Sequence, residues 1–553
     1  MKDLIEKGRI LFEKKDYTNS LNIFLSLDKD NPNNTNILIF IALNFMLLNR
    51  FQEAIETLNK ISSLNNQFPE CYFNRAICYS QLKEYQKSID DYKKAIQLKS
   101  NYHQAYINLG VLLQDLGKFD NAIDVYKIGL QNLENKLDCY INLSGVYKLK
   151  HDTEMVKKYA LKALEIDDHH IFALNNLGTS LIDEGNLDYA ITVLRKGVGI
   201  NSNFAMLYNN LGIAYELKSD YHKAIFYYES AIKIQNDYHD PYFNISQIQL
   251  SNNDFKNGWV NYEHRWEKTE KRPTKIDFIK PKWNPSLGYK RLLVWGEQGM
   301  GEQILFSSIL RDLNDKFQSV LLMVDERLCK IFQEAYPHIT VLSKKEKIDE
   351  NLFDYHLSLG SLPAYFRTDI NDFSNHQILN LQKKDLRFDN PNPKKLKCAI
   401  SWISANPYAG KAKSISLESL KDILLNPHID FYDIQYTNED LEIKKFNDDH
   451  GVSIKQIKDL DKFNDIYQLT HFINSCDFVI TVSNTNAHLA ASIGKPVYLL
   501  LSKERGKFWY WDNIQNGTNL WYPSVNIFKQ LVAGDWSNPI TDLNNQIKVD
   551  YQI

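Results

Sequence analysis

Small and large apolar residues recur along the first half of the chain with a period of 34 residues. The units begin at Met1, Thr35, Pro69, His103, Leu137, Ile171, Ala205 and His239. The eighth place of every unit is small, from Gly8 to Ser246, so two helices can approach closely there. The seventeenth place is mostly large and apolar, and the twentieth is again small in most units. This pattern predicts eight helical hairpins over residues 1–268, with the last unit degenerating after Phe255 into a capping helix.

The second half of the chain has a different pattern, in which short apolar runs alternate with amphipathic segments. Seven runs predict buried parallel strands, at residues 291–295, 319–324, 353–359, 398–403, 430–436, 477–482 and 496–501. Strands that alternate with helices indicate an α/β region with right-handed crossovers. A linker at residues 269–290 precedes this region, and a proline-containing segment at 389–397 divides it. We therefore expect two Rossmann-like lobes, at 291–390 and 391–553, facing a cleft.

Length and charge narrow the possible functions. A chain of 553 residues exceeds what one hydrophobic core supports, so at least two domains are expected. A net charge of -3 disfavours nucleic acid as a partner, because phosphate binding needs a basic surface. Six scattered cysteines indicate a reducing compartment. The N-terminal segment is charged and no window holds 18 uninterrupted apolar residues, so we expect neither a signal peptide nor a membrane span. We therefore expect a cytoplasmic location.

The repeating half resembles the tetratricopeptide repeat, whose helix–turn–helix units stack into a right-handed superhelix with a concave groove. In such a superhelix the sixth place of each unit faces the groove. Phe40 holds this place in the second unit, and six asparagines follow it: Asn74, Asn108, Asn142, Asn176, Asn210 and Asn244. Their amides could pair with the backbone of an extended polypeptide whatever its sequence, as the asparagine ladder of protein O-GlcNAc transferases does. Alternatively, asparagine is simply frequent at this place of the repeat.

A glycine-rich turn follows the first predicted strand of the α/β region. Gly296, Gly299 and Gly301 lie between the strand RLLVW and a helix, where backbone amides attract anions or a reacting oxygen. No GK[ST] follows, so the turn is not a P-loop. The glycine order also differs from the dinucleotide fingerprint, which disfavours an NAD-dependent enzyme.

Two polar loops in the second lobe could hold a diphosphate. A turn between a strand and a small-residue helix would present hydroxyls, amides and N–H groups at the helix start, from Ser483, Asn484, Thr485 and Asn486, with His488 following. A loop after the strand at 398–403 carries Lys411 and Lys413, whose ammonium groups could neutralise a leaving phosphate. The run Asp167–His170 falls at the end of a repeat, and we interpret it as a solvent-facing turn rather than a metal site.

Together these three loops resemble the GT-B glycosyltransferases of the heptosyltransferase-like group, in an arrangement found fused to tetratricopeptide repeats in many bacteria. The resemblance spans residues 285–535. It implies that Glu302, directly after the last glycine of the turn, is the base that deprotonates the acceptor hydroxyl. It also implies that Gly299, Gly301 and the residues of the two polar loops contact the donor, and that Lys411, which matches the family's basic loop, contacts the departing phosphate. The expected reaction inverts the anomeric carbon, uses a nucleotide sugar as co-substrate and needs neither metal nor bound cofactor.

Each of these residues also has a structural interpretation. Glu302, where an aspartate is commoner in the family, could simply favour the helix dipole. Lys411 could be a solvated loop lysine, and His488 a core histidine that caps its helix. The family often has Asp-Ser/Thr-Gly before the His-Leu-Ala segment, whereas this chain has Ser483 to Ala487 there.

Two functions follow from this pattern. The first is a glycosyltransferase that modifies a hydroxyl of a polypeptide held by the repeats, as bacterial flagellin-modifying enzymes of this arrangement are thought to do. The alternative is a non-catalytic adaptor with a degenerate GT-B domain, in which the repeats recruit a partner. A transferase that acts on a glycan lipid would gain nothing from eight peptide-binding repeats. The sequence identifies neither the sugar, the nucleotide, the acceptor nor the oligomeric state.

Overall fold

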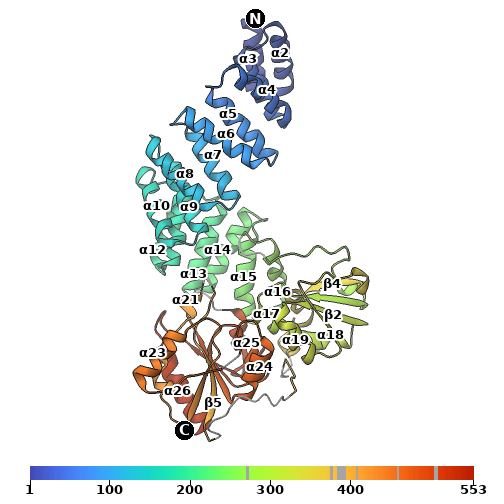
Figure 1. Ribbon diagram of the computed structural model, residues 1–553, viewed down its shortest axis with the longest axis vertical. Coiled ribbons are helices and arrows are strands. Elements are labelled where there is room, and N and C mark those ends of the chain that lie inside the picture. The colour runs from blue at the N-terminus through green and yellow to red at the C-terminus, as the bar shows by residue number, and fades with distance from the viewer. Residues whose placement is uncertain (270–272, 374–377, 383–393, 407–408, 458–459, 504–507) are drawn as a thin grey trace. The chain divides into compact units, whose positions relative to one another are not determined.

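The computed structural model describes residues 1–269, 273–373, 378–382, 394–406, 409–457, 460–503 and 508–553 (Figure 1). The predicted linkers at 269–290 and 389–397 lie partly outside the described residues. The chain forms two compact units, Met1–Lys218 and Ser219–Ile553. The division falls between the two helices of the seventh predicted repeat, and each unit is described by itself.

The first unit consists of helical hairpins, drawn in blue to green in Figure 1. Its helices are α1 (Lys2–Glu13), α2 (Tyr17–Asp30), α3 (Thr35–Leu47), α4 (Phe51–Leu64), α5 (Pro69–Gln81), α6 (Tyr85–Leu98), α7 (His103–Asp115), α8 (Phe119–Asn132), α9 (Leu137–Leu149), α10 (Thr153–Ile166), α11 (Ile171–Asp183), α12 (Leu187–Ile200) and α13 (Ala205–Leu217). From α3 onward the first helix of each hairpin begins at the predicted start of a unit, and every second helix begins at the seventeenth place. The predicted helical repeat is therefore confirmed.

The eighth and twentieth places of a unit touch each other, which explains why both are small. Where the twentieth place is serine, its hydroxyl donates to the carbonyl of the eighth residue: Ser20 to Gly8 at 2.9 Å and Ser88 to Ala76 at 2.7 Å. Gly110 at an eighth place leaves no room for a methyl group, since a Cβ atom there would lie 2.3 Å from the Tyr126 ring. Close approach of the two helices thus sets the 34-residue register.

The fifteenth place makes the turn between the two helices, and it has a positive φ in all eight units. The φ angles run from 58° to 77°, at Lys15, Asn49, Lys83, Gly117, His151, Gly185, Ser219 and Asn253. Only two of these residues are glycine, although this backbone region costs other residues about 1–2 kcal/mol. The positive φ of this turn could not be predicted, because no single residue type marks the fifteenth place.

The second unit begins with helices α14 (Tyr221–Ile234), α15 (His239–Ser251) and α16 (Phe255–Tyr262), followed by the short helix η1 (Glu263–Trp266). Its first sheet is parallel, in the order β3-β2-β1-β4. The strands are β1 (Arg291–Trp295), β2 (Ser319–Val324), β3 (Thr340–Ser343) and β4 (Tyr355–Ser358), and the helices are α17 (Met300–Phe306), α18 (Leu310–Asn314), α19 (Glu326–Ala335) and α20 (Pro363–Phe366). The edge strand β3 was not predicted.

The second sheet is also parallel, in the order β12-β9-β8-β5-β6-β7. Its strands are β5 (Leu396–Ser401), β6 (Ile429–Asp433), β7 (Lys455–Gln456), β8 (Phe478–Val482), β9 (Val497–Leu501) and β12 (Val525–Lys529). Helices α23 (Asp440–His450) and α26 (Ser537–Tyr551) pack on one face, α24 (Ile466–Ser475) and α25 (Thr485–Ser492) on the other. Two short helices, α21 (Gly410–Lys413) and α22 (Lys421–Leu424), and a hairpin of β10 (Ile514–Gln515) and β11 (Thr518–Asn519) complete the unit. The predicted α/β character is confirmed, whereas the edge strands β7 and β12 were missed.

Strand order places the candidate loops at special positions. In the first sheet the chain runs from β1 to β2 and β3 on one side and returns to β4 on the other. In the second sheet it runs from β5 to β6 and β7 and returns to β8. Ligands of open parallel sheets bind where the strand order reverses, at the carboxyl ends of the strands. The loops after β1, β5 and β8 occupy these positions.

The last repeat packs into the α/β region of the same unit through a cluster of tryptophans. Trp259 of α16 lies edge-to-face against Trp509 at a ring distance of 5.2 Å, and its indole N–H donates to the Arg367 carbonyl at 2.7 Å. Asn513 donates to the Leu250 carbonyl at 2.5 Å. Helix α16 is therefore packed as part of the α/β core.

We predict that Gly110→Ala destabilises the first unit by about 1–3 kcal/mol, because its methyl group meets the buried Tyr126 ring. Gly145→Ala is the matched control, since a Cβ atom at this helical glycine meets nothing within 4 Å. It should raise stability by up to about 1 kcal/mol through helix propensity. Urea midpoints of the two variants measure the difference. Equal midpoints would contradict the close-approach explanation.

Candidate functional site

Glu302 lies in the first turn of α17, directly after the carboxyl end of the buried strand β1. Gln303 holds the preceding turn: its amide N–H donates to the Gln298 carbonyl at 2.7 Å, and its oxygen accepts from the Asp325 N–H at 3.1 Å. A Cβ atom on Gly296 would lie 2.6 Å from that oxygen. On the other side, a Cβ atom on Gly301 would lie 2.6 Å from the His488 ring of α25. These two glycines therefore serve close packing.

The Glu302 carboxyl is partly exposed but surrounded by protein, and its pKa is raised to about 7. Burial is the largest cause, and the negative charge of Glu297 adds to it. The Gly299 backbone N–H, Arg265 and Lys413 act in the opposite direction. A carboxyl group with a pKa near 7 can accept and release a proton at physiological pH, as a general base must.

The structure separates the two candidate lysines. Lys413 is buried, with 3% of its surface exposed, and its ammonium lies 4.1 Å from the centre of the Phe508 ring. Burial lowers its pKa to about 8, with Glu302 acting against the change. Among the described residues no carboxylate oxygen lies within 4 Å of its ammonium. Lys411, which the family resemblance favoured, is exposed.

The polar turn after β8 is largely occupied by contacts inside the protein. The Asn484 side chain caps α25 by accepting from the Asn486 N–H at 3.0 Å, and it donates to the Ser401 hydroxyl at 2.7 Å. Asn486 donates to the Ile434 carbonyl at 2.8 Å, and the Ser483 hydroxyl accepts from the Trp511 indole at 3.0 Å. Of the four side chains predicted to face a donor, only Thr485 is partly exposed.

His488 is a core histidine. It is 3% exposed, with one ring nitrogen 2.9 Å from the Tyr522 hydroxyl and the other 3.3 Å from that of Tyr510. Burial, together with the charge of Lys413, lowers its pKa to about 3, so the ring is neutral at physiological pH. Asn484 rather than His488 caps α25, so the predicted capping role was wrong.

Two charged residues that act on Glu302, Glu297 and Arg265, were not predicted from the sequence. Glu297, in the glycine turn, has a fully buried side chain that pairs with Arg265 of η1 at 2.9 Å. Arg265 is 1% exposed and comes from the degenerate end of the last repeat. Their partnership spans 32 residues and no motif marks it. Full burial of an arginine and a glutamate is the signal, and it becomes visible only in three dimensions.

Five of the six ladder asparagines are partly exposed in their helices. The exception is Asn210, which is 8% exposed and donates to the Asn175 side chain at 2.8 Å. Asn142 donates to the Asp138 carbonyl one turn earlier, at 2.8 Å. Phe40, at the same place in the second unit, stacks on Phe24 with ring centres 4.7 Å apart. The column is thus continuous in sequence but varied in its local contacts.

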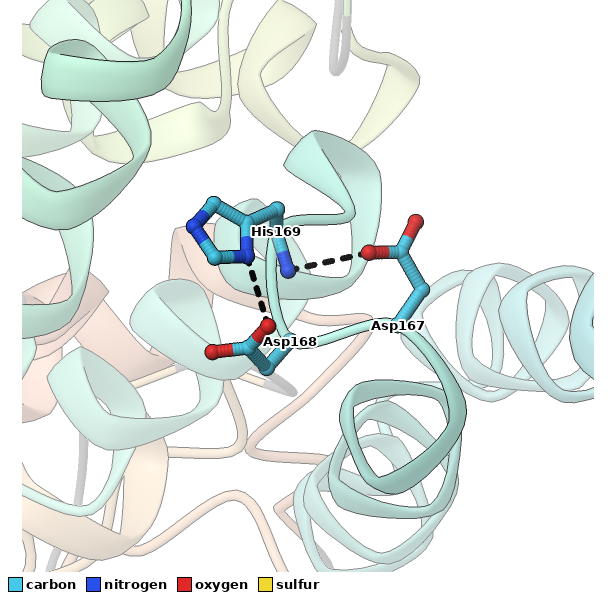
Figure 2. Close-up of side chains that lie close together, drawn as sticks. All are labelled: Asp167, Asp168 and His169. Atoms are coloured by element: carbon cyan, nitrogen blue, oxygen red, sulfur yellow. Dashed lines mark hydrogen bonds and ion pairs between the residues drawn. The ribbon is translucent and has the colours of Figure 1, made fainter.

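Asp167, Asp168 and His169 form a cluster in the turn between α10 and α11 (Figure 2). Each offers one potential ligand atom, and these atoms lie within 4.8 Å of one another. Asp168 contacts His169 at 2.6 Å and pairs with Lys196 at 2.8 Å, and Asp167 accepts from the His169 backbone N–H at 3.1 Å. These contacts give all three residues a role in the turn.

Comparison with known proteins identifies the repeats. Models of the tetratricopeptide repeat match residues 69–102, 103–127 and 206–238. The chain therefore contains tetratricopeptide repeats, followed by parallel α/β sheets.

A curated relative, protein FlbA of Caulobacter vibrioides, is 23% identical over 428 residues, covering 66% of this chain and 70% of its own length. The predicted repeats occupy residues 1–268, which is less than half of the chain. A match that covers 66% of the chain therefore extends into the α/β region.

Two solved structures that are similar to part of the chain are described as tetratricopeptide-repeat proteins. YrrB, described as a tetratricopeptide-repeat protein with an unusual peptide-binding site, is 24% identical, with 34% of this chain and 96% of that chain covered and a TM-score of 0.29. A repeat protein from Parabacteroides merdae is 16% identical, with coverages of 44% and 96% and a TM-score of 0.36. Within the described residues, no helix combines the length and apolar character needed to cross a membrane.

We predict that Glu302→Gln raises stability at pH 8 and leaves it unchanged at pH 5. The folded-state pKa of about 7 lies above the usual 4.5, so ionisation costs stability that is lost as pH rises through 7. Because the carboxyl is partly exposed, we expect a gain of only about 1 kcal/mol at pH 8. Melting temperatures measured between pH 5 and pH 8 test this.

The control for this measurement is Glu346→Gln, at an exposed glutamate of the same lobe. It should leave the pH dependence of melting unchanged. A pH-independent effect of Glu302→Gln would mean that the carboxyl titrates in its ordinary range.

Proposed function

We propose that the second unit carries a glycosyltransferase site, which moves a sugar from a nucleotide-sugar donor to a hydroxyl of a polypeptide. The observation that supports this most directly is the electrostatic interaction between Glu302 and Lys413. A carboxyl with a pKa near 7 and a buried ammonium influence each other electrostatically, and each lies in or just after a loop where the strand order of a sheet reverses. In a group transfer, the carboxylate can act on the acceptor and the ammonium on the leaving group.

The proposed reaction assigns one step to each residue. The Glu302 carboxylate accepts the proton of the acceptor hydroxyl, and the oxygen attacks the anomeric carbon. The bond between that carbon and the nucleotide phosphate breaks from the opposite face, which inverts the configuration. Negative charge then develops on the departing phosphate, where the Lys413 ammonium stabilises it. No step requires a metal ion.

The acceptor in this proposal is an extended polypeptide held along the asparagine column of the repeats. Amide side chains can bond to any peptide backbone, so the repeats would select for extended chain rather than for sequence. Bacterial proteins that this arrangement resembles are thought to modify flagellin, which makes flagellin the first acceptor to try. The matched repeat family supports the protein-binding part of the proposal.

The first experiment distinguishes the two lysines. A melting screen with UDP, GDP, ADP and CMP and their sugar conjugates should show stabilisation by one nucleotide, about 2.7 kcal/mol at 100 times its dissociation constant. Lys413→Met should abolish this shift, whereas Lys411→Met should retain most of it, because only Lys413 is buried beside Glu302. Methionine fills the same space without a buried charge, so the variant should fold.

Two outcomes of this screen contradict the assignment. Loss of the shift in Lys411→Met alone would place the phosphate on the exposed loop. Flat curves with every nucleotide would favour the adaptor, which the internal hydrogen bonds of Ser483, Asn484 and Asn486 also suit.

The second experiment tests the repeats. Replacing Asn108, Asn142 and Asn176 together by alanine should lower kcat/KM for a polypeptide acceptor about a hundredfold, since three lost hydrogen bonds amount to about 3 kcal/mol. Hydrolysis of the donor without acceptor should be unchanged. The control replaces three exposed asparagines outside the column: Asn66, Asn101 and Asn121. Equal transfer by both triple variants would exclude the column as the acceptor site.

A further inference from the structure

The glycine turn before Glu302 carries a second carboxylate, that of Glu297, which is completely enclosed by protein. The Glu297 side chain has no exposed surface. Its oxygen accepts from the Arg265 guanidinium at 2.9 Å and from the Gly360 N–H at 3.1 Å. A buried charge of this kind is tolerated only where such partners are in place.

Arg265 reaches Glu297 from the last tetratricopeptide repeat. Its guanidinium also donates to the hydroxyls of Ser358 at 3.2 Å and Ser361 at 2.8 Å, where β4 ends, and it pairs with Glu263. The guanidinium lies 4.7 Å from the Tyr262 ring centre and 4.6 Å from that of Trp266.

The neighbouring residue of the turn is anchored to α16, the helix that directly precedes η1. The Gln298 amide donates to the Tyr262 hydroxyl at 3.2 Å. Two consecutive residues of the glycine turn, Glu297 and Gln298, therefore contact the end of the last repeat, five and four positions before Glu302.

We propose that Arg265 and Glu297 are positioning residues of the transfer reaction: Arg265 fixes Glu297, and the pair holds the turn that presents Glu302 and sets the field at its carboxylate. This inference rests on the proposed function. It makes the last repeat part of the reaction centre, in addition to any role in binding an acceptor.

Charge supports this role independently of the contacts. Glu297 raises the pKa of Glu302, while Arg265 and Lys413 lower it. His488, Tyr262 and Tyr510 stay uncharged between pH 6 and 9, because the pKa of His488 is lowered to about 3 and burial raises the pKa of Tyr262 and Tyr510 well above the ordinary value. Although burial acts to raise its pKa, Glu263, which pairs with Arg265, stays ionised, because Arg265 and Lys282 lower that pKa to about 2. Among the charges that act on Glu302 directly, Glu297 is the negative one.

Gly360 shows how tightly this arrangement is built. A Cβ atom on Gly360 would lie 2.4 Å from the Glu297 carboxylate oxygen and 3.4 Å from the Arg265 guanidinium. Gly360→Ala would push the carboxylate aside without changing any charge, so it separates position from charge.

The test measures the full-length chain with Glu297→Gln, which keeps the accepting oxygen and removes the charge. The acid limb of kcat/KM should move to lower pH by about one unit, because Glu302 then ionises more readily. The pH at which the stabilising effect of Glu302→Gln levels off should move by the same amount in the Glu297→Gln background. Melting curves give this second value without any activity. Glu346→Gln is the control and should shift neither.

Two further variants address position. Arg265→Lys keeps the charge but lacks the planar fork that binds Glu297, Ser358 and Ser361 together, and it should lower kcat about tenfold with little change in KM for the donor. Gly360→Ala should lower kcat to a similar extent.

The proposal is overturned if the pKa of Glu302 derived from the melting curves is unchanged by Glu297→Gln, or if Arg265→Lys retains full kcat. If that pKa shifts but no nucleotide sugar is ever turned over, the proposed function fails, and the positioning role fails with it. The two failures are thus distinguishable.

Discussion

A buried guanidinium needs hydrogen-bond acceptors inside the protein, because an unpaired charge there costs several kcal/mol. Arg265 imposes this condition on the second unit. Its partners come from the end of the last repeat, from the turn after β1 and from the end of β4. The turn that carries Glu302 can lie only where these partners converge, so the geometry of the candidate site follows from the requirement to satisfy one arginine.

The repeats were predictable because a single packing constraint recurs in each unit. Contact between the eighth and twentieth places leaves a small residue at fixed spacing, and the spacing alone gives the helix boundaries. The α/β region was predictable from its buried strands, but the edge strands β3 and β7 were not, because each is four residues or fewer and poorly covered. Short, half-exposed strands lack the continuous apolar run by which a central strand is recognised.

The candidate site was only partly predictable. Glu302 could be singled out through the family resemblance, which expects an acidic residue directly after the last glycine of the turn that follows β1. Lys411 and Lys413 are two positions apart in one loop, and nothing in their spacing tells which is buried. Arg265 and Glu297 depend on contacts between distant segments, so no local pattern marks them. The end of the first compact unit could not be predicted either. The sequence period continues to residue 268, whereas this unit ends at Lys218. A regular period does not show where the helices begin to pack against residues outside the repeats.

The packing of Trp259 also determines when the last repeat can finish folding during synthesis. Hairpins of the first unit contact mainly their sequence neighbours, so each can form soon after it leaves the ribosome. Helix α16 also packs on its neighbour α15, but the Trp259 side chain needs Trp509 and Trp521, which belong to the last tenth of the chain. Until those residues are made, an apolar tryptophan face at the end of the repeats stays open to water. The final repeat, though encoded near the middle of the gene, is thus among the last elements to be completed, and a nascent chain that stalls there is a natural client for chaperones.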